Sequence, residues 1–134
     1  MKSLTVDSSM RALIGGAFYP KGHTMVMYPS EDLAKDSAQL LLANGFTDDD
    51  IYSVPAADVI AQIAPTVDAD KDSLPSIGSD GNEAREFVKL AREGQSGLLI
   101  ATPDDDAGER LLKVLKQSHY SVASRYFTLV IEDL

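Results

Sequence analysis

Short apolar runs and helically spaced apolar stripes divide the chain into expected strands and helices. Runs at residues 23–29, 51–54 and 96–101 are almost wholly apolar, rich in β-prone residues and bounded by turn-forming residues, which predicts buried strands. Two further runs, at residues 120–124 and 125–132, are predicted to be strands with little chain between them. The sequence therefore supplies five strand candidates.

Three longer segments carry apolar residues at the spacing of an amphipathic helix. Ser30 is predicted to cap the first helix, and Gly45 to end it in the left-handed conformation. The second helix is predicted to begin near Asp80, with Glu83 three residues later as its capping-box partner. The third is predicted to have Thr102 as its N-cap and Pro103 in its first turn. The buried stripes are expected at Ala34, Ala38, Leu41 and Leu42, at Ala84, Phe87, Val88 and Ala91, and at Ala107, Leu111, Val114 and Leu115.

The length of 134 residues fits a single domain with an arm and an insertion. Residues 1–22 show no clean period, and we expect an N-terminal arm there. Residues 55–94 are expected to form a helical insertion, which starts with a short helix at 56–64 that Pro65 ends. Residues 66–79 are polar and have few apolar anchors, so we predict a mobile loop in this segment.

The order strand–helix–strand occurs twice, which predicts an α+β fold of the ferredoxin-like sandwich class. Two split β-α-β units would form a mostly antiparallel sheet with helices on one face only. The strands are nevertheless apolar on both sides, as Met25 and Met27 opposite Val26 and Tyr28 illustrate. The second face therefore needs a cover, which the arm, a second subunit or a bound ligand could provide. We expect a second subunit, and hence a homodimer or higher homo-oligomer.

A known family has the same layout as three segments of this chain, TMVMYPSEDLA, ANGFTDDDIYSV and EGQSGLLIATPDDDAGERLLKVL. On these residues the chain resembles the YflT-like general stress proteins, over residues 24–54 and 83–116, roughly half of its length. The similarity lies in the order of the elements and in the turn residues between them. The resemblance implies a small bacterial stress-associated domain and transfers no active-site residue.

Charge narrows the range of expected partners. Twelve Lys and Arg stand against 21 Asp and Glu, which gives a net charge of −9 and a pI near 4.5. Such a field repels phosphate backbones and anionic lipid head groups, so we expect neither nucleic acid nor membrane as a partner. The absence of cysteine excludes disulfides, thiol nucleophiles and thiolate metal sites. No targeting segment or membrane span is visible in the sequence, so a cytoplasmic location is expected.

Acidic triplets at residues 48–50 and 104–106 are the most conspicuous polar features. Carboxylate clusters can bind hard cations, but one triplet lies in a predicted loop and the other at a predicted helix N-terminus, where acids are favoured. We therefore predict no metal site. The sequence also lacks a nucleophile elbow and a phosphate-binding loop, so we assign no catalytic residue and no cofactor.

Four residues are candidates for a ligand site or an interface: His23, Tyr28, His119 and Tyr126. In a ferredoxin-like fold, strands are expected to begin and helices to end at one edge of the sheet. His23 begins a strand and His119 follows a helix, so both histidines are expected at that edge. Tyr28 and Tyr126 lie on strands and are expected to pack in the interior rather than to stack on bases.

These features favour a non-catalytic, self-associating α+β domain, with a stress-related or regulatory role that only the resemblance implies. Two alternatives stay open. One is a small-molecule sensor or enzyme with a cavity at the second sheet face, and the other is an RNA-binding ferredoxin-like module, which the acidity disfavours. Converging polar groups would indicate a ligand cavity, whereas a continuously apolar surface would indicate a dimer interface.

Overall fold

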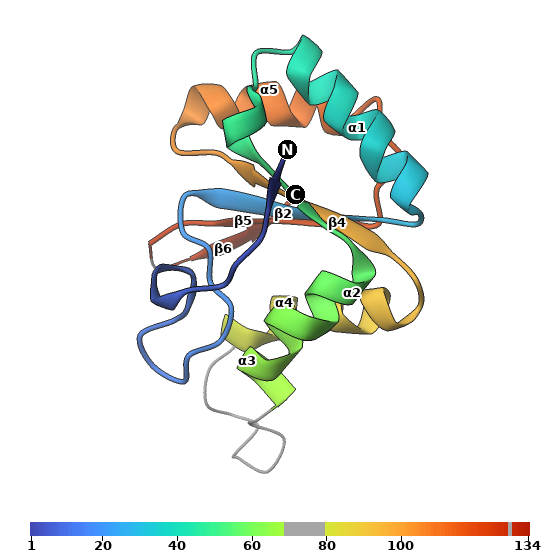
Figure 1. Ribbon diagram of the computed structural model, residues 1–134. Helices are drawn as coiled ribbons and strands as arrows, with labels where there is room; N and C mark the ends of the chain where they lie inside the picture. The colour runs from blue at the N-terminus through green and yellow to red at the C-terminus, as the bar shows by residue number, and fades with distance from the viewer. Residues whose placement is uncertain (69–79, 129) are drawn as a thin grey trace.

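Six strands form one sheet at the centre of the molecule (Figure 1). The computed structural model describes residues 1–68, 80–128 and 130–134. The strand order is β1-β3-β4-β2-β5-β6, with β1 parallel to β3 and the other pairs antiparallel. The strands are β1 (Lys2–Ser3), β2 (His23–Tyr28), β3 (Ile51–Val54), β4 (Ser96–Ala101), β5 (Val122–Tyr126) and β6 (Ile131–Asp133). The structure thus confirms a mixed α+β architecture with a mostly antiparallel sheet.

Two β-α-β units share the middle of the sheet. In the first unit, α1 (Glu31–Ala43) connects β2 to β3, and β4 lies between these two strands. In the second unit, α5 (Asp105–Leu115) connects β4 to β5, and β2 lies between them. Each unit therefore encloses a strand of the other, and α1 and α5 lie side by side over one face of the sheet (Figure 1).

The opposite face of the sheet is also covered, so the expectation of helices on one side only is wrong. Four helical segments lie on that side (Figure 1), namely α2 (Ala56–Asp58), a π-helical turn (Val59–Ile63), α3 (Ala64–Asp68) and α4 (Asp80–Arg92). Met25, Met27 and Leu99 of the sheet share a core with Phe87 of α4 and Phe18 of the arm. The insertion and the arm therefore bury the second apolar face within one chain.

Local signals fix the ends of α1 as predicted. Ser30 has an extended backbone, and its Oγ accepts a hydrogen bond from Leu33 N at 3.2 Å. At the other end, Gly45 has a φ of 92°, and Phe46 N donates to Leu41 O at 3.1 Å. This hydrogen bond is the Schellman contact that a left-handed glycine permits after a helix.

The helix α5 begins two residues later than the sequence suggests. Asp104 is its N-cap instead of Thr102, and Asp104 Oδ1 accepts a hydrogen bond from Ala107 N at 2.9 Å. Thr102 is buried, and its hydroxyl oxygen lies 2.9 Å from the hydroxyl oxygen of Thr24 in β2. Both residues are good caps, and the cross-strand bond of Thr102 decides which of them starts the helix.

Arg125 of β5 supports the turn between β4 and α5. It is only 9% exposed, and its Nη2 donates to Thr102 O at 3.3 Å and to Asp104 O at 2.9 Å. Its guanidinium carbon lies 4.6 Å from the centre of the Phe127 ring. A Cβ on Gly108 would lie 2.1 Å from Arg125 Nη1, so any larger residue there would force the Arg125 guanidinium to shift.

The first helical part of the insertion continues past Pro65, where the sequence predicts its end. The residues before the proline, Val59–Ile63, form a π-helical turn. Proline lacks an N–H and its ring conflicts with the carbonyl four residues earlier, and a wider turn relieves that conflict. Thr66 is buried within α3, so the predicted mobile loop does not begin there. The remainder of that prediction, at residues 69–79, lies outside the described residues.

The helical stripes are buried as predicted, except that Leu42 is 36% exposed. The sequence also places the start of α4 correctly, at Asp80, and Gly94 follows its end with a φ of 95°. The Asp80 side chain, on which the predicted cap of α4 depends, lies outside the described part of the chain. The stripes were predictable because each follows the helical period within a single segment.

The hairpin of β5 and β6 differs from the two strands predicted at residues 120–124 and 125–132. β5 begins and ends two residues later than its predicted strand, and β6 overlaps only the last two residues of the second range and ends one residue beyond it. Phe127 N donates to Val130 O at 2.8 Å and closes the turn between the strands. The apolar run continues through this turn, so hydrophobicity does not reveal where the hairpin bends.

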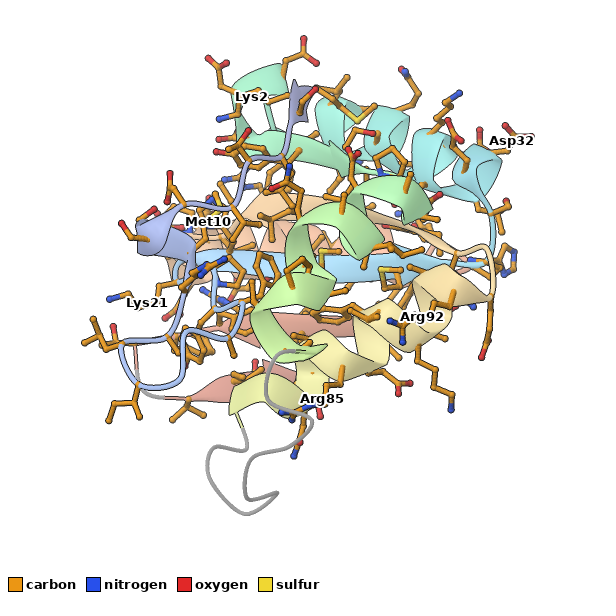
Figure 2. The ribbon with its side chains drawn as sticks, turned by 60° about the horizontal axis from the view of Figure 1, so that its bottom comes forward. Lys2, Met10, Lys21, Asp32, Arg85 and Arg92 are labelled. Carbon is orange, nitrogen blue, oxygen red and sulfur yellow. The ribbon has the colours of Figure 1, made fainter. Side chains whose placement is uncertain are left out.

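The N-terminal arm packs along the same side of the sheet as the insertion (Figure 2). Its first residues form β1 beside β3. Residues 10–19 form a hairpin in which Ala12 N donates to Ala17 O and Tyr19 N donates to Met10 O, both at 2.7 Å. The arm is therefore held by main-chain hydrogen bonds as well as by apolar packing.

Candidate functional site

The two histidines lie at opposite ends of β2, so the expectation that they share a sheet edge is wrong. His23 begins β2 and pairs with Ala101, the last residue of β4. α5 starts just beyond that end, and its 11 residues span about 16 Å, so His119 follows it at the far end. There Ser121 N donates to Met27 O, because β5 runs antiparallel to β2.

The surroundings of the histidines do not suggest a common site. His23 Nδ1 lies 2.9 Å from Lys21 O, and the imidazole centre lies 6.0 Å from the ring centre of Tyr52. Lys2 Nζ lies over the ring of Tyr52, 4.3 Å from its centre. His119 is exposed at the opposite end of the sheet.

Tyr28 is a structural residue beneath α1. Its ring is fully buried, and its hydroxyl lies 2.6 Å from Ser37 Oγ. Ser37 Oγ lies 3.3 Å from Ser118 Oγ, which donates to Val114 O at 2.7 Å. Burial raises the pKa of Tyr28 to about 12, so the phenol is neutral at physiological pH. The hydroxyl chain thus links β2, α1 and the end of α5.

Tyr126 is buried on the other side of the sheet. Its ring makes edge contacts with Tyr19 and Phe18 of the arm, with centres 4.9 Å and 6.2 Å apart. The prediction that Tyr28 and Tyr126 pack in the interior is confirmed, and neither ring can stack on a base. The four candidate residues of the sequence are therefore not brought together.

The acidic triplets have local structural roles. Asp48–Asp50 forms a single 3-10 turn, in which Asp50 Oδ2 accepts a hydrogen bond from Thr47 N at 2.8 Å. Asp104 caps α5, and Asp105 and Asp106 occupy the first turn of that helix. Among residues 1–68, 80–128 and 130–134, no group of three or more His, Cys, Asp or Glu is placed to hold a metal ion.

A cleft of about 690 Å³ lies between α4 and the hairpin of β5 and β6. Figure 2 shows the first half of α4, where Arg85 is labelled, next to these strands. We call this cleft the acidic cavity. Its lining residues are Asn82, Glu83, Glu86, Phe87, Tyr120, Ser121, Val122, Ala123, Ser124, Asp133 and Leu134.

The acidic cavity combines carboxylates with aromatic rings. Glu83 and Glu86 come from α4, and Asp133 comes from β6 on the opposite wall. Tyr120 supplies a partly exposed ring, and Phe87 lies fully buried behind the lining surface. Its described lining residues include three carboxylates and no Lys, Arg or His, so the lining is acidic and suits a cation.

Two hydrogen bonds define the polar rim of the acidic cavity. Ser124 Oγ donates to Asp133 Oδ1 at 3.2 Å, across a register pair of β5 and β6. Arg85 lies one residue before Glu86 on α4, and its Nη1 donates to Asn82 Oδ1 at 3.3 Å. This guanidinium also lies close to Gly81, so it folds back along the helix and is not part of the lining.

Helical and strand periodicity explain how these side chains reach the cleft. Phe87 belongs to the apolar stripe of α4 and is fully buried, whereas Glu83 is half-buried and Glu86 is exposed at the rim. Residues three and four apart lie on neighbouring parts of a helix surface, so Glu83 lies close to both Glu86 and Phe87. The aromatic residue anchors the helix while the carboxylates line the opening.

None of the candidate residues of the sequence lines the acidic cavity. Glu83 carried a signal as a capping residue, and Phe87 as a core residue, but neither indicated a ligand. The arrangement of two carboxylates around an aromatic on one helix was visible in the sequence. The opposite wall was not, because it depends on where β6 pairs with β5 and on the insertion folding onto that edge.

Comparison of the chain with protein-family models, curated proteins and solved structures finds no match. Within the described ranges, no helix is both long and apolar enough to cross a membrane.

Proposed function

We propose that this protein is a non-catalytic binding module that holds a small organic cation in the acidic cavity. The observation that carries the proposal is the lining of that cavity, whose described residues include the carboxylates of Glu86 and Asp133 and no basic side chain. Carboxylates pair with an ammonium or guanidinium group, and the partly exposed ring of Tyr120 adds cation–π attraction and apolar contact.

The size and polarity of the acidic cavity favour a small molecule over a second subunit. Its volume of about 690 Å³ lies within the range of roughly 300–1,000 Å³ that is common for small-molecule sites. Carboxylates, hydroxyls and an amide converge on it, whereas a dimer interface would present a continuous apolar surface. Both apolar faces of the sheet are covered within the chain. Self-association stays a prediction, but the sheet faces no longer provide its argument.

Binding is favoured over catalysis by the character of the polar groups. Ser124 and Asp133 form a serine–carboxylate pair without a histidine between them. A carboxylate is a much weaker base than the imidazole that activates serine in hydrolases. We therefore propose that this pair stabilises the register of the hairpin. The cavity then recognises the charge of its ligand and catalyses no reaction.

Further proposals concern the fold, the domain organisation, the location and the role of this module. The strand order β3-β4-β2-β5, with α1 and α5 on one face, supports a ferredoxin-like unit to which the insertion adds a second helical layer. We propose that the chain folds as a single domain and works in the cytoplasm. The resemblance to YflT-like general stress proteins supports a stress-related or regulatory role for cation binding.

Calorimetric titration with three matched compounds tests the proposed function. We expect 2-phenylethylammonium to bind at least about tenfold more tightly than 2-phenylethanol, because only the ammonium can pair with the carboxylates. Phenylacetate should show no binding to the acidic cavity. Equal affinity for the ammonium and the alcohol, or tighter binding of phenylacetate, would contradict the proposal.

Charge-neutral variants locate the binding. Glu86→Gln and Asp133→Asn should each weaken binding of 2-phenylethylammonium several-fold, and together by about tenfold or more. Glu109→Gln is the matched control, because it removes one exposed carboxylate on α5, on the other side of the sheet. An equal loss in the control would mean that net charge, and not the acidic cavity, attracts the ligand.

A further inference from the structure

We propose that a second cavity, formed by the arm and the β5–β6 turn, binds a small anionic amphiphile with a carboxylate or phosphate head and a short alkyl tail. This cavity has a volume of about 420 Å³. We call it the basic cavity. The residues on which the argument depends are Arg11, Lys21, Leu13, Ile14, Tyr19 and Thr128, all in its lining. The proposal is independent of the acidic cavity.

Two sets of hydrogen bonds hold the walls of the basic cavity together. The hairpin of residues 10–19 is closed by main-chain bonds and by a bridge between Arg11 and Phe18. Tyr19 Oη donates to Phe127 O at 2.8 Å, which ties this hairpin to the turn that carries Thr128. The cavity is therefore built from chain segments more than a hundred residues apart.

The charge of the basic cavity is opposite to that of the whole protein. Arg11 and Lys21 line it, and neither side chain forms an ion pair or hydrogen bond with the described residues. The nearest acid in the sequence, Asp7, is not in the lining. Its carboxylate accepts hydrogen bonds from the hydroxyl and the amide of Ser9, which lower the pKa of Asp7. Two free cations in a protein with a net charge of −9 favour an anionic ligand.

The tip of the hairpin supplies the apolar contact. Leu13 and Ile14 are 102% and 83% exposed, the two most exposed large apolar side chains in the described part of the chain. Gly15 and Gly16 follow with φ values of 85° and 70°, a left-handed backbone that favours glycine and forms the turn of the hairpin. An alkyl chain bound here would remove both side chains from water, and its anionic head would meet Arg11 or Lys21.

An anionic lipid in a bilayer has the same chemistry as a free amphiphile. The free molecule is favoured, because 21 acidic against 12 basic residues repel an anionic surface, whereas a single head group enters between two cations. The apolar tip is also part of a cavity and not of an amphipathic helix, the usual element that lies in a membrane interface. We therefore commit to the free amphiphile.

NMR titration of the labelled full chain with octanoate, butanoate and octanol tests the proposal. Octanoate should shift amide signals of residues 8–21 and bind at least about tenfold more tightly than butanoate, because its longer chain buries more apolar surface. Octanol should bind at least about tenfold more weakly than octanoate, because it lacks the charge. Equal binding of octanol, or octanoate shifts confined to other residues, would overturn the proposal.

Paired variants separate the two contributions. Arg11→Gln with Lys21→Gln should weaken octanoate binding about tenfold or more, whereas Lys113→Gln, an exposed position on α5, should leave it unchanged. Leu13→Ser with Ile14→Ser should reduce the advantage of octanoate over butanoate. Sedimentation with vesicles of phosphatidylcholine and phosphatidylglycerol in equal amounts should leave the protein in solution. Vesicle binding that depends on Leu13 and Ile14 would replace the free amphiphile by a membrane.

Discussion

The two sides of the sheet are built in different ways. On one side, α1 and α5 follow their strands directly, and capping residues next to each helix fix where it begins. On the other side, the cover consists of the arm, α2, α3 and α4, which come from separate parts of the chain (Figure 1). Both sides have an extensive apolar core.

The difference shows where a small α+β chain can place binding chemistry. The side of α1 and α5 is closed by adjacent helices and by a buried chain of hydroxyls. The segments that cover the other side meet the β5–β6 hairpin at both the acidic cavity and the basic cavity. Both clefts thus lie where segments from distant parts of the chain meet.

The largest expected effect is the loss of stability when a buried side chain is truncated in the helix layer of either side. Phe87→Ala on α4 should lower the free energy of unfolding by about 3–5 kcal/mol, and Leu111→Ala on α5 by about 2–5 kcal/mol, because both side chains are fully buried. Denaturant unfolding followed by circular dichroism measures both. A cost below about 1 kcal/mol for Phe87→Ala alone would show that α4 is not packed as part of the fold.

A smaller effect tests how closely α5 approaches the sheet. Gly108→Ala should cost about 2 kcal/mol, because its Cβ would displace the Arg125 guanidinium from the carbonyls that it bonds. In an Arg125→Ala background the same change should be neutral or stabilising, since alanine is the better helix former. Denaturant unfolding of the four proteins completes this cycle. Equal costs in both backgrounds would contradict the contact.

The smallest effect concerns Tyr28 and pH. Its folded-state pKa of about 12 exceeds the ordinary value of 10.0, so its contribution to the free energy of unfolding is complete below pH 10. As pH rises from 10 through 12 this contribution is lost, about 3 kcal/mol in all. Tyr28→Phe should therefore show a shallower loss of stability over that range than the unchanged protein. Identical pH profiles would mean that the phenol is not buried as described.

Elements defined by neighbouring residues could be predicted from the sequence. The ends of α1 follow from Ser30 and Gly45, and the apolar stripes of α4 and α5 follow from helical spacing. Where two local signals competed, the outcome depended on distant partners. Thr102 lost its predicted role as a cap because its hydroxyl is bonded to Thr24, on a strand 78 residues earlier.

The cover of the second face and both cavities could not be predicted in this way. The sequence showed that the second face needed a cover. It could not show which one, because a helix, an arm and a partner subunit would all bury the same apolar residues. The acidic cavity depends on the pairing of Ser124 with Asp133 and on α4 lying beside that pair. Neither this pairing nor the position of α4 can be inferred from the spacing of residues within a single segment.

The most direct test of the central claim is an amide NMR titration with 2-phenylethylammonium, with 2-phenylethanol as the reference. The acidic cavity predicts that the ammonium shifts signals of residues 82–87, 120–124 and 133–134, and that the alcohol at the same concentration leaves them nearly unchanged. Equal shifts with both compounds, or shifts that the ammonium causes only on α1 and α5, would contradict a cation site beneath the β5–β6 hairpin.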